Sequence, residues 1–452
     1  MRLEISQIVE AVKGHANLPP GENRHIKSIS TDSRSIKSGA LFVPIVGDRF
    51  DGHDFISSVI EKGAACALAE AGKIPKGVDF PFITVENTRK ALLEMAAFYL
   101  RLIGAKVVGI TGSTGKTTLK DMIASVLVKK YRTKKTIGNY NNDIGMPLSI
   151  FELVASDEII VLEMGMNHAG EIAPLSRAAK PDVAIITNIG DAHIENFENR
   201  EGILHAKLEI VEGLKKTGYA FFNGDDPLLT GPIAREKTQS LNVFYPKSEN
   251  IVATKSLGLL GTECHFNWKK TDVRVTVPLP GSHMVTNALL ATAVCLELGC
   301  PPEDIAAGFM DFEPSAGRLN ILSAGGKTII NDVYNSSPDA LKGSLKILSE
   351  QTGRKVAIIG DMLELGHMAE KRHLEAGVFA AEVGIDVLIT SGELAKSIHE
   401  SFAAVSKKGT ALHFETKAGF IAKKDEILQG GDIVLVKASR GAKFEEITES
   451  LI

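Results

Sequence analysis

Cysteine is scarce in this chain of 452 residues, which contains only four. No two of them form a Cys-x-x-Cys pair, and four in a chain of this length do not make a disulfide framework. We therefore expect reduced core thiols, as is usual in the cytoplasm, at Cys66, Cys264, Cys295 and Cys300.

Long apolar runs and a basic surplus are also missing. No segment approaches the ~18 to 20 consecutive apolar residues of a membrane span. Residues 1–10 carry an acidic residue early and lack the apolar core of a signal peptide. The 51 basic residues are outnumbered by 55 acidic ones, which argues against a nucleic-acid partner. The sequence thus predicts a soluble, cytoplasmic protein with neither a membrane nor a nucleic acid as partner.

The composition is that of an ordinary globular protein, with 44% apolar and 23% charged residues and no internal repeat. The chain is too long for one hydrophobic core. Short apolar runs typical of buried parallel strands alternate with helical patterns. These patterns predict an α/β fold of three domains: residues 1–82, a doubly wound domain at 83–313 and a Rossmann-like domain at 314–452. Strands are expected at 106–110, 158–162, 183–187, 328–330, 356–359, 387–389 and 433–436, and helices at 88–102, 339–349 and 373–383.

A glycine-rich turn at residues 109–118, Gly-Ile-Thr-Gly-Ser-Thr-Gly-Lys-Thr-Thr, follows a predicted strand and precedes a predicted helix. That context is typical of a phosphate loop, in which backbone N–H groups and a helix N-terminus hold an anion. Ile110 stands where the full Walker pattern has glycine, so the match is to the shorter Gly-x-x-Gly-Lys-Thr. Lys116 is expected at the terminal phosphates and Thr117 on Mg²⁺. The loop by itself would also suit a switch or a motor.

Three further residues are candidates for metal chemistry. Glu163 ends a predicted parallel strand, where a carboxylate faces the ligand crevice, although many such acids are only solvated caps. His193 follows the next strand, but Mg²⁺ prefers oxygen and an isolated histidine is more often a polar rim residue. Lys207 lies on a predicted helix, where a lysine is usually solvated.

Taken together, the motifs of this chain resemble those of the Mur ligase family of ATP-dependent amide ligases. The resemblance covers the whole chain in order. It is carried by residues 111–118, 162–165, 187–193, 206–210, 281–288, 317–318 and 331–335.

Within the family, three stretches are similar to the branch that joins D-alanyl-D-alanine to UDP-N-acetylmuramoyl-tripeptide through an acyl-phosphate, the last cytoplasmic step of peptidoglycan precursor synthesis. They are residues 138–145, 332–338 and 360–366. The chain departs from that branch at Ser336-Ser337, where Asn-Ala-Asn-Pro is usual.

The resemblance implies a role for each matching residue. Lys116, His193 and Lys207 would be catalytic, and two Mg²⁺ ions would be held by Thr117, Glu163, His193 and a carbamylated Lys207. ATP would contact Gly112, Ser113, Thr114, Gly115, Lys116, Thr117, Thr118, Asn287, Arg318, Asn331, Asp332, Tyr334 and Asn335. The UDP-precursor and the dipeptide would contact Ser33, Arg34, Asn141, Asn142, Ser439 and Arg440.

Alternatives stay open at this point. Another ligase of the same fold would share these motifs, for example the one that adds the third peptide residue or a folylpolyglutamate synthase. A nucleotide-dependent switch would share the phosphate loop alone. No motif in the sequence indicates whether the tripeptide substrate ends in diaminopimelate or lysine. A monomer is the expected state.

Overall fold

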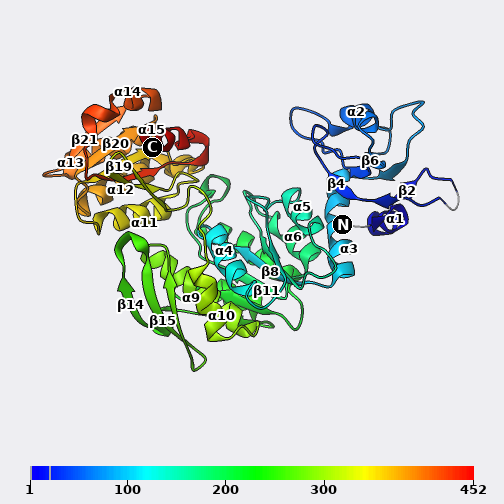
Figure 1. The fold of residues 1–452 in the computed structure, drawn as a ribbon, viewed down its shortest axis with the longest axis horizontal. Helices are drawn as coiled ribbons and strands as arrows, with labels where there is room; N and C mark the ends of the chain where they lie inside the picture. The colour runs from blue at the N-terminus through cyan, green and yellow to red at the C-terminus, as the bar shows by residue number, and fades with distance from the viewer. Residues whose placement is uncertain (1–2, 20–21) are drawn as a thin grey trace.

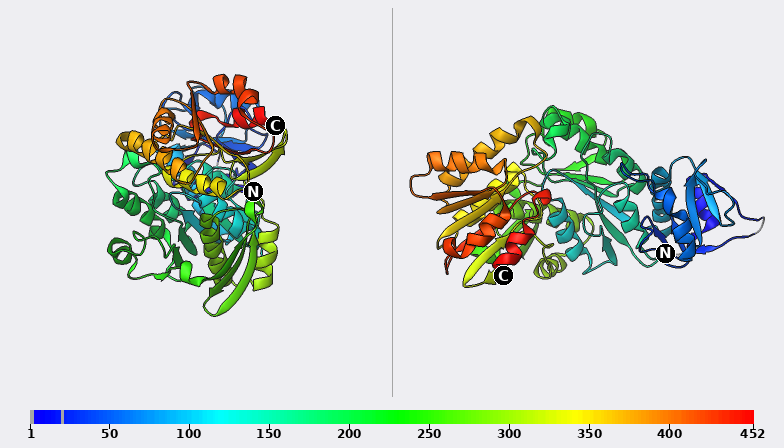
Figure 2. Two further views of the ribbon diagram at one scale, coloured as in Figure 1. Left: turned by 90° about the vertical axis from the view of Figure 1, so that its left-hand side faces the viewer. Right: turned by 90° about the horizontal axis from the view of Figure 1, so that it is seen from above.

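The computed structural model describes residues 3–19 and 22–452. Three lobes follow one another along the chain, with the N-terminal and C-terminal lobes at opposite ends of the molecule (Figures 1 and 2). Within the described residues, no helix has both the length and the apolar character needed to cross a membrane.

The first lobe is a small mixed sheet with the strand order β2-β7-β6-β5-β4, in which only the β2–β7 pair is antiparallel. Its strands are β2 (His15–Ala16), β4 (Ser28–Ser30), β5 (Ala40–Phe42), β6 (Cys66–Glu70) and β7 (Phe82–Val85); β1 (Leu3–Glu4) pairs separately with β3 (His25–Ile26), and the helices are α1 (Ile5–Val12) and α2 (Ile56–Glu61). Because β7 is hydrogen-bonded in this sheet, we place the first domain boundary after Val85 rather than at the predicted 82–83.

The second lobe contains a six-stranded parallel sheet with the order β13-β12-β11-β8-β10-β9. The strands are β8 (Lys106–Thr111), β9 (Thr133–Lys135), β10 (Ile159–Glu163), β11 (Val183–Ile186), β12 (Tyr219–Phe222) and β13 (Asn242–Phe244). The helices of this lobe are α3 (Thr88–Ile103), α4 (Lys116–Leu127), α5 (Gly145–Phe151), α6 (Ile172–Ala179), α7 (Arg200–Leu208), α8 (Pro232–Thr238), α9 (Ser282–Glu297) and α10 (Pro302–Met310). Among them α4, α5 and α6 pack on the sheet, whereas α9 and α10 pack on α4. After β8 the chain forms β9 and β10 on one side of that strand, and then β11, β12 and β13 on its other side. The carboxyl ends of β8, β10 and β11 therefore form the switch point at which open α/β sheets bind ligands.

An antiparallel sheet of three strands inside the second lobe was not predicted. It consists of β14 (Ile251–Ser256), β15 (Thr262–Trp268) and β16 (Thr271–Val277), and it packs beside α9 and α10. Along β15 and β16 buried and exposed residues alternate, which is the pattern of a sheet that packs on one face only.

The third lobe is a second α/β unit with the strand order β17-β18-β22-β19-β20-β21. Its strands are β17 (Asn320–Ala324), β18 (Lys327–Asn331), β19 (Lys355–Gly360), β20 (Val387–Ser391), β21 (Thr410–Phe414) and β22 (Ile433–Lys437), and its helices are α11 (Pro338–Ser349), α12 (Ala369–Glu382), α13 (Ala395–Val405), α14 (Lys417–Ile427) and α15 (Glu445–Leu451). All neighbouring pairs except the β17–β18 hairpin are parallel, which confirms the expected α/β fold. The carboxyl end of β18 faces the second lobe.

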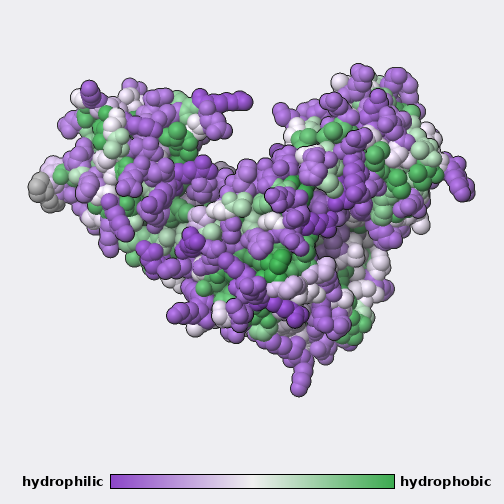
Figure 3. All heavy atoms as spheres, turned by 180° about the vertical axis from the view of Figure 1, so that it is seen from behind, coloured by the Kyte–Doolittle hydropathy of each residue, from purple (hydrophilic) through white to green (hydrophobic). Residues whose placement is uncertain are grey.

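Apolar residues are concentrated in the interior of the lobes. The central strand β8 is buried from Val107 to Thr111 because helices cover both faces of its sheet. The face of the molecule seen in Figure 3 is mostly polar, with apolar residues in small groups, and a notch separates the first lobe from the third. All four cysteines are buried and unpaired, as expected.

Candidate active site

The phosphate loop occupies residues 112–115, between the end of β8 and the start of α4. Gly112 and Gly115 have φ angles of +147° and +80°, a region that side chains with a Cβ rarely adopt. A Cβ on Gly112 would lie 1.8 Å from the hydroxyl oxygen of Thr187. The loop therefore needs glycine both for its backbone conformation and for its contact with the neighbouring strand.

Residues that follow β11 fix the shape of the loop. The backbone N–H of Ser113 donates to the carbonyl of Asn188 at 3.0 Å, and the Asn188 side-chain amide donates to the Thr114 hydroxyl at 2.8 Å. The Ser113 hydroxyl accepts from the N–H of Gly190 at 2.8 Å. The loop is thus held in place before any ligand binds, which lowers the cost of binding.

Lys116, the first residue of α4, lies folded back over the loop. Its Nζ donates to the carbonyl oxygens of Gly112 at 2.7 Å and Ser113 at 3.3 Å. Burial lowers the pKa of this ammonium, and the negative charge of Glu163 opposes that shift. A phosphate in the loop would give Lys116 the anionic partner that favours its charged form.

Glu163, at the end of β10, faces Thr117 at the start of α4. Its Oε2 accepts from the Thr117 hydroxyl at 2.8 Å, and its Oε1 accepts from the Asn141 amide at 3.0 Å. Neighbouring oxygens on an octahedral Mg²⁺ lie about 2.9 Å apart. The hydroxyl oxygen of Thr117 and the carboxylate oxygen of Glu163 are therefore suitably spaced to bind one Mg²⁺ ion beside a phosphate group.

Among residues 3–19 and 22–452, no three His, Cys, Asp or Glu side chains are arranged to hold a metal by themselves. Mg²⁺ commonly takes one or two protein ligands and completes its shell with substrate phosphates and water. The pair of Thr117 and Glu163 suits that mode of binding better than a dedicated protein cage.

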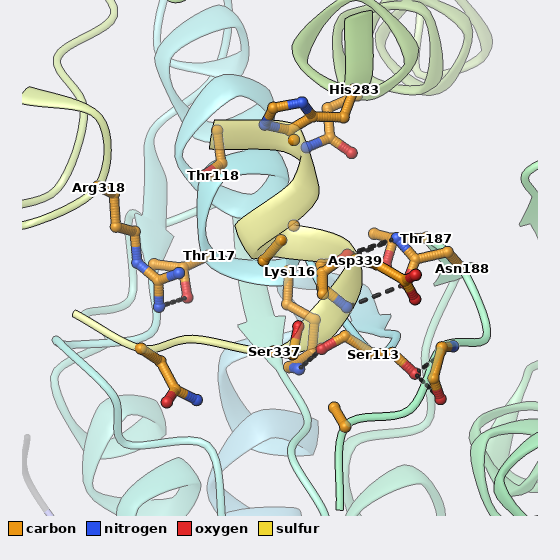
Figure 4. Close-up of a pocket in the computed structure, with 18 of the residues that line it drawn as sticks. Ser113, Lys116, Thr117, Thr118, Thr187, Asn188, His283, Arg318, Ser337 and Asp339 are labelled. Carbon is orange, nitrogen blue, oxygen red and sulfur yellow. Dashed lines mark hydrogen bonds between the residues drawn. The ribbon is translucent and has the colours of Figure 1, made fainter. Parts of the chain in front are cut away.

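The third lobe closes the other side of the site. Its Arg318 donates to the Thr117 hydroxyl at 2.9 Å and stacks 3.9 Å above the ring of Tyr334. In Figure 4, Lys116 and Thr117 lie between Arg318 on one side and Ser113 and Asn188 on the other. Residues of both lobes enclose a cavity of about 630 Å³, a size in the range of small-molecule sites.

A buried ion pair stiffens the third lobe's wall of the cavity. Asp332, just after β18, accepts from the Lys437 ammonium at 2.5 Å and from the Ser344 hydroxyl at 2.7 Å. The Lys437 ammonium also donates to the carbonyl of Asn335 at 3.0 Å. Sequence reasoning missed Lys437, although its position at the end of a parallel strand was a usable signal.

Lys207 is buried in the last turn of α7, with 1% of its surface exposed. No hydrogen bond or ion pair of its ammonium occurs within the described part of the chain. Burial, and then the nearby positive charge of Lys116, lower its pKa well below the usual value. The expectation of a solvated surface lysine is therefore wrong at this position, although Lys207 does not line the cavity itself.

His193 lines the cavity in a left-handed backbone conformation, with φ +62°. Its Nδ1 lies 2.7 Å from the carboxylate of Glu364, which belongs to the third lobe. The ring therefore stands at the boundary between two lobes.

The structure brings most of the predicted ATP and metal residues to this cavity. Its lining includes Ser113, Thr114, Gly115, Lys116, Thr117, Thr118, Asn141, Glu163, His193, Asn287, Arg318, Asp332, Tyr334 and Asn335. It also includes residues that sequence reasoning had not selected, among them Asn188, His283, Asp339 and Lys437. His283 and Asp339 reach the cavity from α9 and α11 (Figure 4). His283 lies within the motif at residues 281–288, whereas Asp339 lies outside every motif named above.

Other predicted residues lie outside this lining. Asn331 accepts instead from the Thr448 hydroxyl at 3.2 Å, and Asn142 accepts from the backbone of Gly145 at 2.8 Å. Ser439 donates to the carbonyl of Ser336 at 3.1 Å. Arg440 is exposed, with its guanidinium 5.7 Å from the centre of the Tyr334 ring. Ser33 and Arg34 lie in the first lobe, where Arg34 pairs with Asp32 at 2.9 Å.

A phosphate loop at a switch point, a magnesium-compatible oxygen pair and a third lobe over the nucleotide cavity define a class of multidomain nucleotide-dependent α/β enzymes. Three family models match this chain: "Mur ligase family, catalytic domain" at residues 25–100, "Mur ligase middle domain" at 110–295 and "Mur ligase, glutamate ligase domain" at 317–440. The chain belongs to the Mur ligase family.

The chain is similar over its length to individual members of that family. It is 39% identical to UDP-N-acetylmuramoyl-tripeptide–D-alanyl-D-alanine ligase of Bacillus subtilis, over 99% of this chain and 98% of the relative. The crystal structure of MurF from Acinetobacter baumannii superposes with a TM-score of 0.91 at 31% identity, covering 100% of this chain and 99% of the other. The crystal structure of MurF ligase from Thermotoga maritima in complex with ADP superposes with a TM-score of 0.82 at 30% identity, covering 94% of this chain and 96% of the other.

Proposed function

We propose that this chain joins D-alanyl-D-alanine to the terminal carboxylate of UDP-N-acetylmuramoyl-tripeptide with the hydrolysis of ATP. The observation that carries the proposal is the cavity in which the phosphate loop of the second lobe faces Arg318 and Asp332 of the third. Full-length similarity to ligases of that name supports the choice of substrates. The reaction belongs to peptidoglycan precursor synthesis, and hence to cell-wall formation, cell shape and division, and we assign it to the cytoplasm.

The first chemical step activates the carboxylate. A carboxylate oxygen attacks the γ-phosphorus of ATP, the bond to the β–γ bridging oxygen breaks, and ADP leaves. Anions approach each other in this step, so the charge of Lys116 and the N–H groups of residues 112–116 stabilise its transition state. Mg²⁺, when bound by Thr117 and Glu163, supplies further positive charge at the phosphate oxygens.

The second step forms the amide. The dipeptide amine attacks the acyl carbon, loses a proton, and the tetrahedral intermediate expels inorganic phosphate. Water would hydrolyse the acyl-phosphate, and closure of the third lobe over the loop excludes it. One chain supplies both walls of the cavity, so the proposal requires only a monomer.

For the remaining substrate contacts we keep the residues named from the sequence. The partly buried Ser33 and the exposed Arg34 would hold the diphosphate of the UDP-precursor, and Asn141 and Asn142 its peptide. Ser439 and Arg440 would hold the dipeptide carboxylate. An arginine fork suits both kinds of anion, and this supports Arg34 and Arg440 in particular.

We further propose that Lys207 is carbamylated. Only a neutral amine attacks carbon dioxide, and burial, which lowers the pKa of Lys207, favours the neutral form of its side chain. The amine nitrogen would bond to the carbon of CO₂ and release one proton, which leaves an anionic oxygen donor. In its unmodified form the side chain is a poor Mg²⁺ ligand, because that ion prefers oxygen. Labelling with ¹³C-bicarbonate, followed by NMR of the wild type and of Lys207→Met, tests this step.

Phosphate release from ATP tests the proposed function. The purified chain is incubated with UDP-N-acetylmuramoyl-tripeptide, ending in either diaminopimelate or lysine, with and without D-alanyl-D-alanine. We expect strong release only when the dipeptide is present, and a product heavier by the dipeptide less one water. Release without any dipeptide would favour a nucleotide-dependent switch, and activity only with another amine would favour a different ligase of the same fold.

A further inference from the structure

Asp191 joins three elements of the site that come from different parts of the chain. It lies in the loop after β11 that also carries Gly190 and His193, and its side chain is buried at 4% exposure. One carboxylate oxygen lies 2.5 Å from Nε of Arg200, the first residue of α7. The other lies 2.8 Å from a terminal nitrogen of Arg372 on α12 of the third lobe.

These partners matter because of what their elements carry. The loop of Asp191 holds the Ser113 hydroxyl through Gly190, and Lys207 lies in the last turn of α7. Arg372 therefore connects the third lobe, through one carboxylate, to the phosphate loop and to the helix of the buried lysine. None of the residues Asp191, Arg200 and Arg372 lines the nucleotide cavity.

Neighbouring contacts bring the two lobes together at the same place. Glu364 faces His193 at 2.7 Å, and its backbone carbonyl accepts from the N–H of Glu195 at 3.4 Å. Gly366 begins the short helix η6 (Gly366–Met368), and a Cβ there would lie 2.9 Å from the side chain of Glu195. Asp339, on α11, lies 3.6 Å from Arg200. The lobes are thus in close contact at the Asp191 loop.

The buried carboxylate of Asp191 has two arginine partners, and losing either one would leave its negative charge less well compensated. Desolvation makes such a charge costly when its partners move away, so separation of the lobes carries a free-energy penalty. The arrangement therefore favours the closed state in which Arg318 reaches Thr117.

We propose that Arg372 is a positioning residue, which couples docking of the third lobe to the geometry of the phosphate loop through Asp191. The inference rests on the proposed ligase function. Loss of Arg372 leaves the phosphate loop, Lys116 and Glu163 intact but removes the ion pair between the Asp191 carboxylate and the third lobe. Misplacement of reacting groups by about 1 Å costs on the order of 100-fold in rate.

The test compares Arg372→Met with Arg372→Lys and with a matched control, Arg354→Met. Arg354 also holds a buried aspartate, Asp432, at 3.1 Å, but both residues belong to the third lobe. Each variant is assayed for kcat and KM with all three substrates and for its melting temperature. Small-angle X-ray scattering of the free protein reports the separation of the lobes.

We expect Arg372→Met to lower kcat by about 10- to 100-fold and to increase the radius of gyration, and we expect Arg372→Lys to recover most of the loss. Arg354→Met should lower the melting temperature at least as much, with kcat within about twofold of the wild type. The proposal is overturned if Arg372→Met keeps wild-type kcat, or if Arg354→Met loses as much. An inactive wild-type chain would instead refute the ligase function, independently of Arg372.

Discussion

Replacing Lys207 by methionine should make the protein more stable and at the same time inactive. The ammonium is buried without an ionic partner in the described chain, so folding must either desolvate its charge or neutralise it. Methionine has a similar shape and no charge. Replacing a buried ion pair by apolar residues of similar volume is neutral or stabilising by about 1–4 kcal/mol, and Lys207 lacks, among the described residues, even the opposite charge that would offset its burial. We expect a gain in that range at pH 7 in buffer free of carbon dioxide.

The gain should depend on pH. Folding lowers the pKa of Lys207, so the folded state binds fewer protons than the unfolded state at any pH between the two pKa values. The stability of the wild type therefore rises with pH in that window, by about 1.4 kcal/mol per unit, up to about pH 10.4. The methionine variant lacks this dependence. Its advantage over the wild type should consequently shrink as the pH is raised toward the pKa of an unperturbed lysine.

Urea denaturation of both proteins at several pH values measures the difference. Lys437→Met is the matched control, because Lys437 is equally buried but pairs with Asp332 at 2.5 Å. Removing it leaves a carboxylate without its partner, and we expect a loss of about 3–5 kcal/mol. A Lys207→Met variant less stable than the wild type, or an advantage that does not change with pH, would refute the reasoning. Ligase activity of Lys207→Met near the wild-type level would refute the proposed role of the lysine.

Three other perturbations test the site. Gly112→Ala places a methyl group 1.8 Å from the Thr187 hydroxyl at φ +147°, and calorimetry should show ATP binding weaker by about 10- to 100-fold; unchanged affinity would mean that the loop does not need this backbone. Glu163→Gln keeps the shape but removes the charge beside Thr117, so the Mg²⁺ concentration for half-maximal activity should rise about 10- to 100-fold with the melting temperature unchanged. Removing Mg²⁺ with EDTA should abolish turnover reversibly, without unfolding the chain; activity that persists in EDTA would exclude the proposed use of Thr117 and Glu163.

Much of this protein could be predicted from local sequence. The strands at 106–110, 158–162 and 183–187 were predicted to within one residue of β8, β10 and β11, because buried parallel strands are short apolar runs. The phosphate loop was predicted for a similar reason, since its glycines, its lysine and the start of α4 lie within a few residues of each other. The position of Glu163 followed from its place at the end of a strand.

The sequence did not predict β14, β15 and β16. One face of β15 and β16 is exposed, so their alternating pattern is weaker than a continuous apolar run, and β14 is exposed along almost its whole length. Lys207 was first read as a surface residue for a related reason. The sequence around it is compatible with an amphipathic helix, and only the packing of α7 against the rest of the second lobe buries the side chain.

The α/β class, the nucleotide loop and the family of this chain can be inferred from its residue order, because these features depend on residues that are neighbours along the backbone. The folded chain is needed to see that Arg318 reaches Thr117, that Lys437 pairs with Asp332, and that Arg372 pairs with Asp191. Each of these contacts joins residues on separate elements, two of them on separate lobes. Their formation depends on how whole sheets and helices pack, and no local pattern of residues contains that information.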